Sequence, residues 1–68
     1  MNKNDGSYRK MDFKEPQAGS YVTVYQRPGE DVMLDVQFFD GDRNLDEAIL
    51  CKRLLDAAIK QAREWSEE

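Results

Sequence analysis

The sequence predicts a small α+β domain in which antiparallel strands precede one long C-terminal helix. Two alternating runs rich in β-branched and aromatic residues flank a Pro-Gly pair, and an uninterrupted helical pattern fills the last third of the chain. With 68 residues, the chain can form one domain at most. The sheet is expected to be either a two-stranded hairpin (ββα) or a three-stranded meander (βββα).

The N-terminal residues 1–19 are expected to be a flexible segment ahead of a single domain at residues 20–68. Residues 1–6 are polar and show no periodicity. Residues 7–14 alternate loosely, with Met11 and Phe13 on the same side. This pattern predicts a short edge strand or an unstructured leader. Both alternatives stay open at this point.

Two strands are expected at residues 20–27 and 32–39. The first is rich in β-branched and aromatic residues, and the second alternates cleanly between apolar and mixed positions. Between them, Pro28 presets φ for a turn, and Gly29 permits the positive φ that a type II turn requires. The apolar row of the second strand is Val32, Leu34, Val36 and Phe38. We expect this row to pack against the helix while the opposite face meets water or a polar partner.

A single helix is expected at residues 44–66. Asn44 suits the N-cap position, and Glu47 lies where its side chain completes a capping box. Apolar residues recur at three- and four-residue steps: Ala48, Cys51, Leu55, Ala58, Ala62 and Trp65. Further apolar residues widen this stripe on both flanks: Leu50, Leu54, Ala57 and Ile59. At about 100° per residue the apolar sector covers more than half of the circumference, which is wider than a core-facing stripe.

This wide apolar sector predicts self-association. A two-stranded hairpin is only about 10 Å wide, so it cannot cover the sector. A chain this short is marginally stable alone, and with one cysteine and no histidine it has neither an internal disulfide nor an expected zinc site. We therefore expect a homodimer, joined through hairpin edges or through a small-residue seam of the helix that consists of Ala48, Cys51, Ala58 and Ala62. The interface candidates are Ile49, Leu50, Leu54, Ile59 and Trp65.

Composition narrows the setting in which the protein works. The net charge of −4 disfavours nonspecific binding to nucleic acid, which depends on Lys and Arg neutralising phosphates. A single cysteine suits a reducing compartment, so we expect a cytoplasmic location. The sequence has no signal-peptide pattern and no apolar run of about 18 residues, so we expect no membrane partner.

Two patterns that resemble sites of chemistry fail on inspection. Asp40, Asp42 and Asn44 begin like a calcium-binding loop, but Leu45 replaces the required glycine and Cys51 replaces the bidentate glutamate. Cys51 is also the only candidate nucleophile. It has no histidine to act as its base, and it lies within the apolar sector, where a thiol packs as a small hydrophobe. We therefore predict no enzymatic activity, no cofactor and no bound metal.

The first strand offers a second candidate surface. Tyr21, Tyr25 and Arg27 share one face, and aromatic residues interleaved with basic ones can stack bases and hold phosphates. Acidic residues of the neighbouring strand and turn oppose this use. The strand-face binding candidates are Tyr21, Tyr25, Arg27, Asp35 and Gln37.

The favoured function is a non-catalytic protein–protein interaction module, a homodimeric regulator or inhibitor of a larger protein. The alternative is a nucleic-acid-binding regulator that uses this strand face and the basic N-terminus. The order of hairpin, acidic turn and helix loosely resembles that of strand-rich antitoxin domains, of the DNA-binding arms of phage integrases and of small phage proteins that inhibit host enzymes. This likeness makes a phage or prophage origin an expectation, but no motif accompanies it and no functional residue is carried over.

Overall fold

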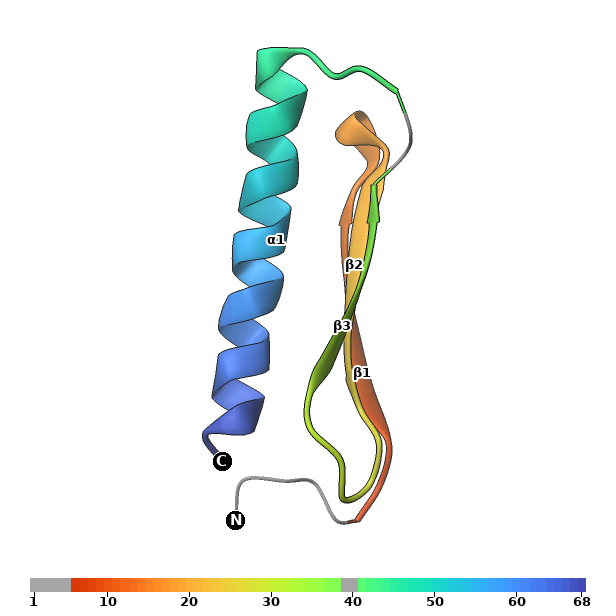
Figure 1. Cartoon of the computed structure of the whole chain (residues 1–68), viewed down its shortest axis with the longest axis vertical. Helices are drawn as coiled ribbons and strands as arrows, with labels where there is room; N and C mark the ends of the chain where they lie inside the picture. The colour runs from red at the N-terminus through yellow and green to blue at the C-terminus, as the bar shows by residue number, and fades with distance from the viewer. Residues whose placement is uncertain (1–5, 39–40) are drawn as a thin grey trace.

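The computed structural model describes residues 6–38 and 41–68 (Figure 1). Its elements, in chain order, are β1 (Arg9–Glu15), the 3-10 helix η1 (Pro16–Ala18), β2 (Ser20–Gln26), β3 (Met33–Phe38) and α1 (Leu45–Ser66). The prediction of an α+β fold is confirmed in its three-stranded form, because most of the segment at residues 7–14 lies in β1. The predicted strand end at Phe39 and the first five residues of the leader lie outside the described residues.

The three strands form an antiparallel meander in the order β1-β2-β3. Phe13 pairs with Val22, and Val22 pairs with Val36, so these side chains share one face of the sheet. The helix α1 runs along that face over the whole length of the strands (Figure 1). Among the described residues, no helix or strand covers the opposite face, which we call the open face (Figure 1).

The core lies between the centre of the sheet and one stripe of the helix. Its buried residues are Val22, Val24, Leu54, Ala58, Ala62 and Trp65. Phe13, Leu34 and Leu55 pack against this cluster from its borders and are partly buried. Ala58 is fully buried, because a methyl side chain lets the helix approach the sheet closely. The predicted pairing of two helices along the small-residue seam is therefore not available, since three of its four residues, Cys51, Ala58 and Ala62, are buried within the chain. Ala48 alone of the seam is exposed.

The two ends of α1 differ in how well they are fixed. At the start, Asn44 Oδ1 accepts a hydrogen bond from the Glu47 amide (2.8 Å), and Glu47 Oε1 accepts one from the Asn44 amide (3.1 Å), which is the predicted capping box. On the exposed side, Lys52 forms an ion pair with Asp56 at 2.9 Å.

A polar cluster fixes the other end of the helix to the sheet. Gln26 is fully buried at the end of β2, where its Oε1 accepts hydrogen bonds from Arg9 Nε (3.1 Å) and Nη2 (2.8 Å). The Gln26 amide donates to the carbonyl of Glu30 (2.8 Å), so its side chain is satisfied on both sides. The Arg9 guanidinium also lies 4.5 Å from the centre of the Trp65 ring and 2.7 Å from Glu68. Arg9 thus links β1, β2 and the end of α1.

Candidate interaction surfaces

Two surfaces of the domain are candidates for function: the open face of the sheet and the edge of β3. The open face carries the strand-face candidates Tyr21, Tyr25, Asp35 and Gln37 together, as the alternation of the strands predicts. The edge of β3 carries apolar side chains on the helix side of the sheet. The two surfaces differ in charge and in hydrogen bonding, so they suit different partners.

Hydrogen bonds between side chains run across the open face. Tyr21 Oη donates to Gln37 Oε1 (2.7 Å), and Gln37 Nε2 lies 3.4 Å from Asp35 Oδ2. One strand further, Thr23 Oγ1 donates to Asp12 Oδ1 (2.7 Å). These bonds are exposed, so each contributes little to stability. Their effect is to hold the polar side chains in one arrangement across all three strands.

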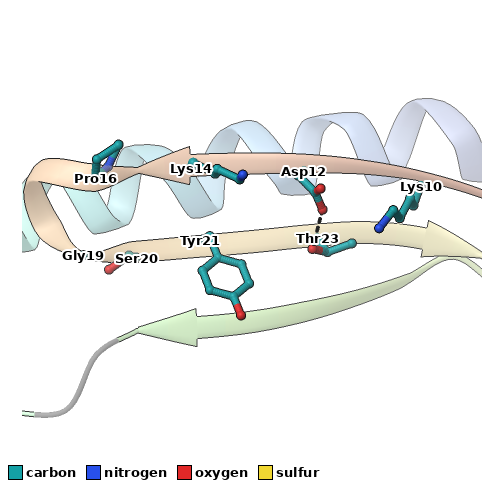
Figure 2. Close-up of a pocket in the computed structure, with 8 residues that line it drawn as sticks. All are labelled: Lys10, Asp12, Lys14, Pro16, Gly19, Ser20, Tyr21 and Thr23. Atoms are coloured by element: carbon teal, nitrogen blue, oxygen red, sulfur yellow. Dashed lines mark hydrogen bonds between the residues drawn. The ribbon is translucent and has the colours of Figure 1, made fainter.

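The open face contains a shallow hollow of about 560 Å³ over β1 and β2 (Figure 2). Lys10 and Lys14 border it from β1, with Asp12 between them, while Tyr21 and Thr23 border it from β2. Lys14 is paired with Tyr21 in the register, so an ammonium group and a phenol ring are neighbours on this face. A hollow of this kind can hold a planar or anionic group, although the Asp12 carboxylate lowers its positive charge.

Tyr25 is the other aromatic residue of the open face, and its ring already has neighbours. The Arg27 guanidinium lies 5.2 Å from the ring centre, within the range of a cation–π contact. The ring of Tyr8 lies 6.4 Å away and is tilted by 36°. Stacking a ligand on Tyr25 would compete with Arg27 or Tyr8. Tyr21 is therefore the more accessible ring of the two for a ligand in the hollow.

The second surface is the β3 apolar row, which we define as Leu34, Val36 and Phe38. These residues lie on the helix side of the sheet, but Val36 is 44% exposed and Phe38 is 39% exposed. The cause is the position of the helix: Val22 and Val24 of β2 are buried beneath it, whereas the ribbon of β3 lies farther from α1 than those of β1 and β2 do (Figure 2). The helix thus covers β2 well and leaves the end of β3 uncovered.

The free edges of β1 and β3 are protected to different degrees. β1 carries a charged side chain at most of its positions: Arg9, Lys10, Asp12, Lys14 and Glu15. β3 carries only Asp35 as a charged residue and contains no proline. Among the described residues, no strand pairs with the outer edge of β3. Charges along an edge strand discourage pairing with another chain, so β3 is the edge at which a further strand can add.

The interface candidates of the helix occupy three different environments. Leu54 and Trp65 lie in the core, with 8% and 9% of their surfaces exposed, so their apolar area is used within the chain. Leu50 and Ile59 are half-buried, on the flanks of the helix stripe that faces the sheet. Ile49 is 38% exposed and lies one turn from Leu45, which is 75% exposed. The sequence did not identify the β3 apolar row as an exposed surface, because an apolar row that packs against a helix shows the same alternation.

Chemically reactive groups are scarce on both surfaces. Cys51 is buried, and its Sγ lies 3.2 Å from Ser20 Oγ, which donates its own hydrogen to the Ala18 carbonyl. Within residues 6–38 and 41–68, no three His, Cys, Asp or Glu side chains gather where they could hold a metal ion. Asp40, part of the calcium-like pattern, lies outside these residues. No helix in the described part of the chain is long and apolar enough to span a membrane.

Comparison with known proteins identifies no relative of this chain. No protein-family model, no curated protein and no solved structure matches the chain. Its function therefore has to be inferred from its own residues and their arrangement.

Proposed function

We propose that this chain is a non-catalytic protein–protein interaction module that works as a homodimer through the edge of β3. The observation that supports this most directly is the exposure of Val36 and Phe38 on an edge strand that has a single charge. An unpaired strand edge offers backbone N–H and C=O groups to a second strand, and the neighbouring apolar side chains add burial.

The size of the domain gives a second reason for association. A domain of 68 residues leaves a large share of its surface exposed and gains stability when it buries more apolar area. Two copies joined at β3 would form one continuous sheet of six strands. The open faces of both copies would remain free, and there the dimer would bind a larger protein as its regulator or inhibitor.

Sedimentation equilibrium of the unmodified protein over a wide concentration range tests this proposal. We expect a dimer at both modest and high salt, because apolar contacts and backbone hydrogen bonds dominate the interface and are weakly screened. Ile49→Lys, on the exposed side of the helix, is the control variant for comparison with the unmodified protein. It should leave the dimer intact, because Ile49 lies away from β3.

Two results would count against the proposal. A folded monomer at all concentrations would exclude the homodimer. A monomer produced by Ile49→Lys, with the far-UV circular dichroism spectrum unchanged, would move the interface to the exposed side of the helix, around Leu45 and Ile49.

A second candidate function, binding of single-stranded nucleic acid, is favoured by the hollow of the open face. Lys10 and Lys14 are four residues apart on one strand, hence about 13 Å apart, which is close to the separation of phosphates two nucleotides apart in an extended strand. Tyr21 lies beside Lys14 and offers a ring for stacking. The overall charge of −4 and the acidic residues Asp12 and Asp35 oppose it.

Fluorescence anisotropy with labelled oligonucleotides separates the two functions. If the open face binds nucleic acid, the affinity should fall steeply between low and physiological salt. Lys14→Ala should weaken binding, whereas Lys60→Ala, on the exposed side of the helix, should not. The absence of any anisotropy change at low salt with single-stranded DNA and RNA would exclude this second candidate.

A further inference from the structure

We infer that the two copies of the dimer join through antiparallel pairing of β3 with β3, in the register that places Val36 opposite Val36 of the second copy. This inference rests on the proposed function, because it assumes that the chain associates through the edge of β3. It adds which residues meet, and therefore which substitutions act across the interface.

Symmetry restricts the arrangements that need to be considered. A two-fold axis normal to the sheet brings two β3 edges together antiparallel and keeps both helices on the same side. Residues directly opposite each other in an antiparallel pair point to the same face of the sheet. The β3 apolar row of one copy then meets the β3 apolar row of the other, and the polar residues of the open faces meet each other.

In only two registers of this kind, five of the six residues of β3 lie opposite a β3 residue of the second copy. In the first, Asp35 faces Asp35 of the second copy, so two like charges lie directly opposite each other, which is destabilising. In the second, Val36 faces Val36, Leu34 faces Phe38, and Asp35 faces Gln37. Asp35 is exposed on the open face, and an amide opposite it can donate a hydrogen bond to its carboxylate. Charge therefore selects the second register.

The selected register also matches apolar residues according to exposure. Val36 and Phe38 are the most exposed members of the row, whereas Leu34 is partly buried against the core. In this register the axis passes beside Val36, and each Phe38 ring lies opposite a Leu34 side chain of the second copy. Every member of both rows gains an apolar neighbour across the new strand pair. Aromatic and branched side chains opposite each other are favourable pairs in sheets.

Disulfide cross-linking of single-cysteine variants tests the register. In a Cys51→Ser background, where a hydroxyl replaces the thiol next to Ser20, Val36→Cys should form a cross-linked dimer in oxidised glutathione. Opposite residues of an antiparallel pair have Cα atoms about 4.5 or 5.5 Å apart, and both distances suit a disulfide. Leu34→Cys is the matched control on the same face. Its two copies would lie about 13 Å apart along the strands and should cross-link at least about tenfold less.

A mixture of Leu34→Cys and Phe38→Cys chains supplies the complementary result. These two positions face each other in the selected register, so a disulfide should form between the two different chains, identified by mass spectrometry. A mixture of Met33→Cys and Gln37→Cys chains, which keeps the charge of Asp35, should not cross-link, because these two positions face each other only in the first register. Efficient cross-linking of this mixture with none at Val36→Cys would overturn the register in favour of the one that charge disfavours.

Sedimentation of the reduced variants distinguishes failure of the register from failure of the proposed function. If the reduced Val36→Cys protein is a dimer but does not cross-link, the register is wrong and the dimer stands. If the Cys51→Ser protein is a folded monomer at all concentrations, the homodimer itself is wrong, and the register falls with it.

Discussion

Replacing Trp65 with alanine should lower the free energy of unfolding by about 3–5 kcal/mol, the range for truncating a buried tryptophan. Trp65 is the largest side chain of the core cluster and is 9% exposed. It also lies under the Arg9 guanidinium, 4.5 Å from its ring centre, so truncation removes this contact as well. A domain of 68 residues has roughly 3–10 kcal/mol of stability in total. The variant should therefore lose a large share of the stability of the domain.

Urea denaturation followed by far-UV circular dichroism measures this effect, since tryptophan fluorescence is lost with the residue. Trp65→Phe is the matched control, because it keeps a ring beneath Arg9 and loses less volume. It should be clearly more stable than Trp65→Ala. Both variants must be compared at one protein concentration, because association raises the apparent stability. An unfolding midpoint for Trp65→Ala equal to that of the unmodified protein would show that the end of the helix does not hold the core.

Local patterns predicted the elements of the fold because the forces that form them act over a few residues. Alternation placed Val22 and Val24 on the helix side of β2, and Asn44 and Glu47 marked the start of the helix through their own capping bonds. The sequence alone leaves open whether β1 forms, because its alternation is interrupted by charged residues. It forms because β2 offers it a full set of partners, from Arg9 opposite Gln26 to Glu15 opposite Ser20.

Contacts between distant residues could not be predicted in the same way. Alternation does place Gln26 in the buried row, but only its pairing with β1 shows that Arg9 satisfies it there. The periodicity of the helix predicted an apolar sector too wide for the sheet to cover, and therefore predicted that part of the helix is exposed. The structure places Leu54 and Trp65 of that sector in the core and exposes Val36 of the sheet instead. The difference depends on where the helix lies across the three strands, which no local pattern specifies.

The substitution Val36→Asp should weaken the dimer far more than Val36→Asn does. Both variants lose the same apolar contact and have nearly the same shape, but only aspartate adds a charge. In the proposed register residue 36 faces itself, so two carboxylates would lie about 5 Å apart across the axis. With an effective dielectric constant between 80 and 20, their repulsion costs about 1–3 kcal/mol. This corresponds to a roughly 5- to 150-fold higher dissociation constant for Val36→Asp than for Val36→Asn.

Sedimentation equilibrium at low and high salt checks this difference and its cause. The gap between the two variants should narrow at high salt, because the repelling charges lie at an edge that solvent reaches. Gln37→Asp provides a test on the open face. It brings a second carboxylate opposite Asp35 of the other copy, whereas Gln37→Lys brings an ammonium group there, so the two should shift the dissociation constant in opposite directions. Equal dissociation constants for Val36→Asp and Val36→Asn at low salt would mean that residue 36 does not lie opposite residue 36 of the second copy. In the proposed register the two aspartates would necessarily repel each other.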